Sequence, residues 1–456
     1  MNFSVEGQHV VVIGAARSGI AAAELLVSRG ARVTVSDTRA GVDGADRLRA
    51  AGVELDLGGH LDDVFADADL AVLSPGVPAR LPVLDGLRRR GVPVIGELEL
   101  AWRWLRGRVI AITGTKGKST TTTLTGRMLQ AAGLPAVVGG NIGTALSAQV
   151  ETSTPDTLHV VEVSSFQLET ADTFHPWIAV LMNFSADHLD RHGSIEAYGD
   201  AKARIFAHQT PDDWAVVNAD DEGARRLARG ARAARFDFSR EARVDEGVVV
   251  EGGAVTRRQG GRREPLLPLA SIRLLGPHLV DDVLAAAAVG SLVGVAPGVM
   301  QQAIEDFHGL EHALEPLEVI AGVRFVNDSK ATNIEAARRA LESFDAGVVA
   351  IIGGRFKGGD FRDLRAAAPR LAAVVAIGEA KGMVREALQD RLPVHDADSM
   401  RDAVRAAFAA AAPGGVVLLA PACASFDMFR DYAERGRIFK EEVQRLGQEW
   451  RTQREQ

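Results

Sequence analysis

Residues 114–120 read GTKGKST, and these residue types could bind the phosphates of a nucleotide. Glycines let backbone amides turn inward around oxyanions, a lysine supplies a cation for the β- and γ-phosphates, and a serine hydroxyl can bind Mg²⁺. Gly114, Gly117, Lys118 and Ser119 provide these groups. The usual G-x-x-x-x-G-K-[ST] loop begins with a glycine where this chain has Ile112. The sequence therefore predicts a phosphate loop of altered spacing.

Acidic and histidine side chains follow later apolar runs and could bind the metal that accompanies such phosphates. Glu162 lies inside the run LHVVEVSS, where an unpaired carboxylate is costly and a nearby cation is expected. Mg²⁺ prefers few carboxylates together with phosphate oxygens. Downstream, NFSADHLDRH carries Asp187, His188, Asp190 and His192. Taken alone, that stretch is equally well explained as a solvated acidic loop.

A second glycine turn, GAARSG, lies near the N-terminus between a predicted strand and a predicted helix. Gly14 and Gly19 are spaced as in a dinucleotide-binding turn, but Ala16 occupies the position of the middle glycine. Asp37 follows at the distance of a ribose-binding acid. A nucleotide-sugar diphosphate at the helix N-terminus is one interpretation, because free N–H groups there favour anions. A plain strand–helix turn and a hydride-transfer enzyme are the alternatives, and the missing glycine disfavours the second.

These residues would be positioned by short apolar strands that alternate with helical patterns, which is typical of parallel α/β folds. Three such blocks are expected, over residues 1–97, 98–309 and 310–456. Residues 236–267 differ, since β-branched runs split by Gly-Gly predict antiparallel hairpins. Ligands of open parallel sheets bind beyond the carboxyl ends of the strands. The pattern therefore predicts a composite site between the blocks.

Composition excludes several classes of protein. The chain has 456 residues, 46% hydrophobic and 25% charged, as in ordinary globular proteins, and its net charge of −8 argues against a nucleic-acid partner. The single cysteine, Cys423, excludes an intrachain disulfide and fits a reducing compartment. No run approaches the ~18 apolar residues of a membrane span, and the first residues lack the features of a signal peptide. We expect a cytoplasmic monomer without a membrane span.

Taken together, the motifs resemble those of the Mur ligases, the ATP-dependent enzymes that form amide bonds in peptidoglycan precursors. The similar stretches are TGTKGKST, in which a Thr-Gly pair replaces the distant glycine, VVEVSSFQLE, GGNIG, VNDSKATN and APACASFDMF, in order over essentially the whole chain. They are most similar to the branch that adds D-glutamate to UDP-N-acetylmuramoyl-L-alanine through an acyl phosphate, releasing ADP and phosphate. The resemblance implies three α/β domains: a Rossmann-like UDP-binding domain, a central P-loop ATPase-like domain and a Rossmann-like C-terminal domain.

The resemblance also implies roles for individual residues. Catalysis would depend on Lys118, His188 and Lys202. Two Mg²⁺ ions would be held by Ser119, Glu162, His188 and Lys202, the last as N6-carboxylysine. ATP would be bound by Gly114, Thr115, Lys116, Gly117, Lys118, Ser119, Thr120, Asp328 and Lys330. The UDP substrate would be bound by Gly14, Ala16, Arg17, Ser18, Asp37, Thr38, Arg39, Ser74, Gly76 and Asn141. D-Glutamate would be bound by Lys330, Thr332, Lys357, Ser425 and Tyr432.

Two places depart from the family pattern. Leu279 and Asp282 stand where asparagines are usual and adenine is often read, and Ala313 stands where an arginine is usual near the ATP phosphates. Losing a charge-assisted contact costs about 1.5–3 kcal/mol. Arg338 or Arg355 could supply a replacement cation.

Other functions stay open at this point. Another Mur-type or folate-polyglutamate ligase would share the phosphate loop, although the N-terminal α/β block disfavours the folate class and no DNPR-like signature is visible. A non-catalytic nucleotide-sugar-binding protein is suggested by Leu279 and Ala313. It is disfavoured because the chain retains Lys118, Ser119, Glu162, His188 and Lys202.

Overall fold

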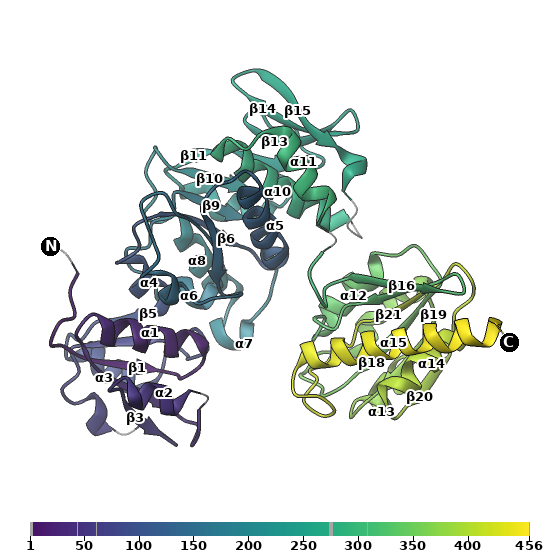
Figure 1. Cartoon of the computed structure of the whole chain (residues 1–456), viewed down its shortest axis with the longest axis horizontal. Coiled ribbons are helices and arrows are strands. Elements are labelled where there is room, and N and C mark those ends of the chain that lie inside the picture. Colours follow the sequence, from purple (N-terminus) through teal and green to yellow (C-terminus); the bar gives the residue numbers. More distant parts are fainter. Residues whose placement is uncertain (1–2, 43, 61, 273–276, 308, 456) are drawn as a thin grey trace. The chain divides into compact units, whose positions relative to one another are not determined.

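The chain folds into two compact units (Figure 1), the first formed by residues 1–272 with 278–306 and the second including residues 307–456. The computed structural model describes residues 3–42, 44–60, 62–272, 277–307 and 309–455. Parallel sheets flanked by helices dominate both units, which confirms the predicted α/β class. Among the helices in these ranges, none combines the length and apolar character needed to span a bilayer.

The N-terminal domain is built on a sheet of five parallel strands in the order β3-β2-β1-β4-β5. The strands are β1 (His9–Ile13), β2 (Arg32–Asp37), β3 (Glu54–Leu57), β4 (Leu70–Leu73) and β5 (Val94–Gly96), and the helices are α1 (Arg17–Ser28), α2 (Ala45–Ala50) and α3 (Pro82–Arg89). Strand β1 reads HVVVI and is buried throughout, as expected for a strand covered on both faces. The strand order reverses between β1 and β4, so the loops after these strands border one crevice.

The central domain has six parallel strands in the order β11-β10-β9-β6-β8-β7. The strands are β6 (Arg108–Thr113), β7 (Ala136–Gly140), β8 (Leu158–Glu162), β9 (Ile178–Leu181), β10 (Trp214–Val217) and β11 (Ala234–Arg235). The helices are α4 (Glu97–Trp102), α5 (Lys118–Ala131), α6 (Ser165–Glu169), α7 (Leu189–His192), α8 (Ile195–Ala203) and α9 (Glu222–Leu227). Strand β6 lies between β9 and β8, which brings the loops after all three strands to one edge.

A smaller sheet follows, with the strands β12 (Asp237–Ser239), β13 (Gly247–Glu251), β14 (Ala254–Gln259) and β15 (Arg262–Pro268). The predicted antiparallel hairpins are confirmed for β13, β14 and β15. The prediction was wrong for β12, which pairs parallel to β13. The chain between these two strands crosses over as a longer connection, whereas a tight turn would have made them antiparallel. Helices α10 (Pro277–Val293) and α11 (Pro297–Glu305) complete the first unit, and α11 packs on β15 and α5.

The second unit contains a six-stranded sheet in the order β16-β17-β21-β18-β19-β20, antiparallel only between β16 and β17. The strands are β16 (Glu315–Ile320), β17 (Val323–Asn327), β18 (Val348–Gly353), β19 (Leu371–Ile377), β20 (Val394–Ala397) and β21 (Val416–Leu419). The helices are α12 (Ile334–Glu342), α13 (Lys381–Leu388), α14 (Met400–Ala410) and α15 (Tyr432–Glu455). Figure 1 shows the long α15 lying along one face of this sheet.

The predicted boundaries at residues 97 and 309 stay predictions. The N-terminal and central sheets belong to one compact unit, within which α4 begins directly after β5.

Candidate active site

The phosphate loop joins β6 to α5, and both of its glycines are required by its shape. Gly114 and Gly117 have φ angles of 157° and 82°, which L-residues rarely adopt. A side chain at Gly114 would place its Cβ 2.7 Å from the Cβ of Met182, and one at Gly117 would lie 2.2 Å from Oδ1 of Asp282. Both positions therefore require glycine, because the backbone of the loop lies too close to its neighbours for a side chain.

Asn183, directly after β9, holds this loop in place. Its Oδ1 accepts from the backbone N–H groups of Thr115 at 3.1 Å and Lys116 at 2.8 Å, and its Nδ2 donates to the Lys116 carbonyl at 3.1 Å. Sequence analysis missed Asn183. Its position at a strand end, like that of Glu162, was the available signal.

Two lysines meet over the loop. Lys118 Nζ donates to the carbonyls of Gly114 at 2.9 Å and Thr115 at 3.1 Å. Lys202, on α8, is 1% exposed, and its Nζ donates to the same Gly114 carbonyl at 2.8 Å. Burial, reinforced by the charge of Lys118, holds the pKa of Lys202 well below its ordinary value, although Asp187 and Glu162 oppose the shift. Lys202 therefore tends toward a neutral amine.

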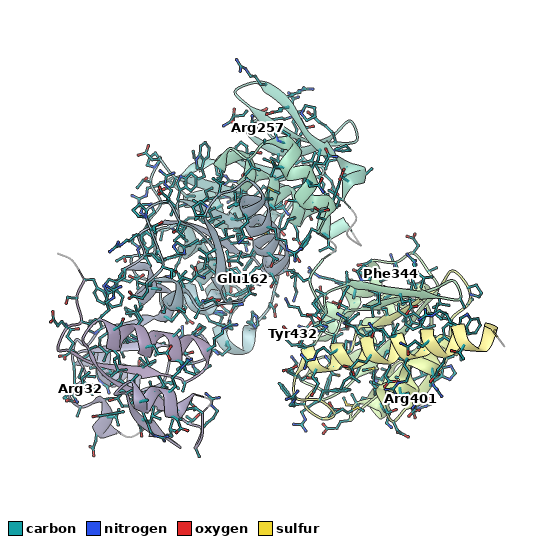
Figure 2. All side chains as sticks on the ribbon, in the orientation of Figure 1. Arg32, Glu162, Arg257, Phe344, Arg401 and Tyr432 are labelled. Atoms are coloured by element: carbon teal, nitrogen blue, oxygen red, sulfur yellow. The ribbon has the colours of Figure 1, made fainter. Side chains whose placement is uncertain are left out.

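Glu162, labelled in Figure 2, is the last residue of β8. Its Oε1 accepts from Asn141 Nδ2 at 2.6 Å, whereas the buried Oε2 has no hydrogen-bond partner within the part of the chain that the structure describes. The Asn141 carbonyl in turn accepts from Arg17 Nη2 at 3.2 Å. An orphaned buried carboxylate oxygen fits a divalent cation. Asn141 thus connects this acid to the N-terminal domain.

The loop after β9 carries His188 in a left-handed conformation, with φ of 53°. Phe166 packs against His188 with ring centroids 5.0 Å apart, and Asp187 pairs with Lys116 at 3.3 Å. His192 Nε2 lies 2.9 Å from Ser165 Oγ. The side chain of Asp190 lies outside the described residues. His188 and Asp187 therefore follow β9 at the same edge of the sheet at which Glu162 ends β8.

Asp37 anchors the N-terminal glycine turn. Its Oδ2 accepts from the Ala15 N–H at 2.7 Å, and it pairs with Arg39 at 2.8 Å. The hydrogen bonds from Arg39 hold the pKa of Asp37 far below its ordinary value. The carboxylate therefore stays ionised and fixes the turn to β2.

A cavity of about 700 Å³ lies beside this turn. Of the residues proposed to bind the UDP substrate, Ala16, Arg17 and Arg39 line it. Arg47, which sequence analysis missed, also lines it and pairs with Glu24 of the same lining at 2.6 Å. The remaining proposed residues lie outside its lining: Gly14, Ser18, Asp37, Thr38, Ser74, Gly76 and Asn141. The cavity thus presents three guanidinium groups, of which Arg39 and Arg47 are paired with acids, beside apolar walls, and these groups could meet an anionic nucleotide.

In the second unit, proposed D-glutamate residues meet at the carboxyl ends of β17, β18 and β21. Lys357 Nζ donates to Thr332 Oγ1 at 3.4 Å. Asp328 Oδ1 accepts from the Leu314 N–H at 3.1 Å, and burial raises the pKa of Asp328 to about 7. Ser425 is buried, whereas Tyr432, labelled in Figure 2, is 41% exposed.

Arg435 ties two of these loops together and was also missed. Its buried guanidinium donates to Oγ and O of Ser329, at 3.0 and 2.8 Å, and to the Cys423 carbonyl at 3.1 Å. Ser329 Oγ donates onward to the carbonyl of Tyr432 at 2.7 Å. The local sequence could not predict the role of Arg435, because it is one of several arginines on a charged helix.

The two arginines suggested as replacement cations for Ala313 are paired with acids. Arg338 pairs with Glu335 at 2.9 Å, and Arg355 pairs with Glu379 at 3.0 Å. Neither is a spare cation in this structure.

Comparison with known proteins gives the family. The N-terminal part matches the family model of the Mur ligase MurD-like N-terminal domain over residues 8–96. The Mur ligase middle domain matches over residues 112–290, and the Mur ligase glutamate ligase domain over residues 314–423. A protein of Acidobacterium capsulatum named UDP-N-acetylmuramoylalanine–D-glutamate ligase is 46% identical over 96% of both chains. This chain belongs to the Mur ligase family.

Another relative and two solved structures are also similar to this chain. A relative with the same name from Koribacter versatilis is 43% identical over 98% of this Mur ligase and 99% of its own chain. The crystal structure of the UDP-N-acetylmuramate–alanine ligase of Thermotoga maritima is 20% identical, with a TM-score of 0.60 over 96% of this chain and 100% of that chain. The MurF ligase of the same organism, solved with ADP, is 16% identical with a TM-score of 0.60, over 97% and 96%. The predicted three-domain α/β fold is confirmed.

Asp282, at one of the departures from the Mur ligase pattern, lies beside the phosphate loop. It sits on α10 against Gly117 and is 2% exposed, and its Oδ2 has no hydrogen-bond partner among the described residues. Burial and the charge of Asp281 raise the pKa of Asp282 well above its ordinary value, against hydrogen bonds from Thr120 and Thr121. The other departure, Leu279, is half-buried on the same helix. The carboxyl of Asp282 is thus directed at the loop.

Asp282→Asn is expected to stabilise this Mur ligase at pH 8. A carboxyl whose pKa is raised in the folded state takes up a proton on folding. The free energy of unfolding is therefore highest at low pH and falls as pH rises through the folded pKa. The asparagine amide cannot ionise, so at pH 8 the variant should have a free energy of unfolding about 1–3 kcal/mol higher than the parent. This difference should be measured as a higher Tm at pH 8 and should shrink toward pH 5.

Asp220→Asn is the opposite control, because hydrogen bonds from Ser239 and nearby backbone lower the pKa of Asp220. Its Tm should drop at pH 8 and approach the parent value as pH falls. A lower Tm for Asp282→Asn at pH 8, or an equal gain at both pH values, would contradict the assignment.

Proposed function

We propose that this Mur ligase adds D-glutamate to UDP-N-acetylmuramoyl-L-alanine at the expense of ATP, as a cytoplasmic monomer in peptidoglycan precursor synthesis. The observation that carries the proposal is the linked set Arg17, Asn141 and Glu162, beside the phosphate loop. It joins a nucleotide-sized cavity to an unsatisfied metal-type carboxylate. The relatives named for this reaction support the choice of substrates.

The proposed reaction overcomes the poor reactivity of a carboxylate toward amines. The L-alanine carboxylate oxygen attacks the γ-phosphorus of ATP, the bond to the β-phosphate oxygen breaks, and ADP leaves. The neutral amine of D-glutamate then attacks the carbonyl carbon of the acyl phosphate. The tetrahedral intermediate loses phosphate and a proton to give the amide. Lys118 and the loop amides would neutralise charge on the transferred phosphoryl group, which is an electrostatic role.

The residues present fit Mg²⁺. Glu162 Oε2 and the Ser119 hydroxyl would hold one ion, and His188 with a modified Lys202 would hold a second. When bound, these ions would supply positive charge to the phosphate oxygens. Within the described residues no three His, Cys, Asp or Glu side chains gather as a metal cluster, which suits an ion completed by phosphate oxygens and water.

Lys202 is proposed to carry a carbamate. Its amine would attack CO₂, forming an N–C bond and releasing a proton, to give an anionic oxygen ligand. Burial favours the neutral amine that this reaction needs. The modification would also replace one of two ammonium groups that share the Gly114 carbonyl.

The remaining proposed contacts involve the N-terminal cavity and the second unit. Arg17 and Arg39 would meet the uridine diphosphate in the N-terminal cavity. Asp328 would accept from the ATP ribose. The D-glutamate carboxylates would be met by Lys330, Thr332, Lys357, Ser425 and Tyr432.

The test is turnover by the purified full chain with UDP-N-acetylmuramoyl-L-alanine, ATP and Mg²⁺, offering D-glutamate, L-lysine or D-alanyl-D-alanine in separate reactions. Phosphate release and the product mass should appear with D-glutamate alone. Turnover with one of the other amines, or UDP-substrate binding without turnover under any condition, would refute the proposal.

A further inference from the structure

Arg191 connects the His188 loop to the N-terminal domain within the first unit. It lies on α7, one turn after His188, and its Nη1 donates to the Gly76 carbonyl at 3.2 Å while Nη2 donates to the Val77 carbonyl at 3.3 Å. These carbonyls belong to the turn that follows β4. A guanidinium fork can hold two acceptors in fixed geometry, which a lysine cannot do. The contact therefore joins two loops more than a hundred residues apart in sequence.

The same guanidinium packs on the aromatic ring that supports His188. Its Cζ lies 4.3 Å from the centroid of the Phe166 ring. Phe166 also contacts His188 at 5.0 Å and stacks on His192 at 5.2 Å, with the planes 13° apart. His188 adopts a left-handed conformation that needs support from its surroundings. Phe166 supports His188 by direct ring contact, and Arg191 supports it through Phe166.

The turn that Arg191 holds also contacts the N-terminal glycine turn. A Cβ at Gly14 would lie 2.7 Å from Val77 Cγ2 and 3.0 Å from Ser74 Cβ. Movement of the glycine turn would therefore displace Val77 and, through it, the guanidinium. Contacts run without a gap from Gly14 through Val77 and Arg191 to the His188 loop.

We propose that Arg191 is a positioning residue that couples the UDP-substrate turns to the His188 loop, so that binding of the UDP substrate orders the site of acyl transfer. The inference rests on the proposed function for the identity of that substrate. It assigns to Arg191 no contact with the reacting atoms.

The test compares Arg191→Met, Arg191→Lys and the matched control Arg90→Met. Methionine retains a stem that can pack on Phe166 but removes both hydrogen bonds. Arg90 likewise donates to two consecutive carbonyls, those of Phe65 and Ala66, within the N-terminal domain and away from this site. Arg191→Met should raise the KM for the UDP substrate about tenfold and lower kcat about tenfold, with the KM for ATP within about twofold of the parent value. Arg191→Lys should recover part of both losses.

Direct titration of the UDP substrate by calorimetry separates this inference from the proposed function. If the parent protein binds the UDP substrate but does not turn over, the proposed reaction fails, while a Kd about tenfold weaker in Arg191→Met than in Arg90→Met still supports the coupling. Kinetics and binding in Arg191→Met that match Arg90→Met would overturn it. Equal rises in the KM values for the UDP substrate, ATP and D-glutamate, together with a lowered Tm, would also overturn it, because they would indicate a general destabilisation of the fold. If Arg191→Met does not fold, Arg191→Lys decides by the same KM comparison.

Discussion

Replacing Lys118 with alanine is expected to reduce phosphate release about 100- to 1000-fold while leaving UDP-substrate binding nearly unchanged. The Lys118 Nζ lies over the phosphate loop, bonded to the carbonyls of Gly114 and Thr115. Removing it takes away positive charge where negative charge develops on the γ-phosphoryl group. The UDP cavity is lined by other residues, so its affinity should persist.

The measurement pairs steady-state phosphate release with calorimetric titration of UDP-N-acetylmuramoyl-L-alanine. Lys381→Ala serves as the control, since Lys381 pairs with Asp398 at an exposed position of the second unit. Near-parental turnover by Lys118→Ala would show that the loop lysine does not stabilise phosphoryl transfer. Loss of UDP-substrate binding would show that the loop belongs to a different site.

Lys202→Ala is expected to lower turnover by a similar factor, and short carboxylates such as acetate are expected to restore part of it. The side chain is almost fully buried beside the phosphate loop, 4.7 Å from the Tyr198 ring centroid. Its removal would take away the proposed carbamate and leave a space for a small carboxylate. Rescue by a carboxylate is expected only if the native group is an anion, and an amine should give none.

Carbamylation is observed directly by carbon NMR after equilibration with ¹³C-labelled bicarbonate. The parent protein should show a carbamate resonance that Lys202→Ala lacks, and acidification in CO₂-free buffer should remove both the resonance and the activity. A parent protein without the resonance that stays fully active would contradict the modification. Rescue of Lys202→Ala by methylamine rather than acetate would assign the lysine a cationic role instead.

The parts of the fold that sequence analysis predicted are those encoded locally. Buried runs such as RVIAIT in β6 and VVAIIG in β18 are apolar because both faces of a parallel strand are covered. The phosphate loop was visible because its glycines are fixed by backbone shape. The short strand β12 was misassigned since its partner is chosen by tertiary packing rather than by its own turn.

The residues that sequence analysis missed act across long separations. Asn183 orders a loop 67 residues upstream, and Arg435 holds a serine 106 residues before it. Asn183 had one local signal, its position at the end of a predicted strand, and Arg435 had none, so their partners are visible only in the folded structure. Asp282 was recognised as a departure from the family pattern, yet its contact with Gly117 required the packing of α10 on the loop.

Activation of the L-alanine carboxylate by phosphoryl transfer can be followed with oxygen-18 placed in that carboxylate. The experiment incubates the parent protein with ATP, Mg²⁺, D-glutamate and UDP-N-acetylmuramoyl-L-alanine that carries oxygen-18 at both carboxylate oxygens, then determines the masses of the released phosphate and of the amide product. We expect one oxygen-18 atom in each phosphate and one in the amide product. Unlabelled phosphate would show that ATP is hydrolysed without activating the carboxylate, and the proposed reaction would then be wrong.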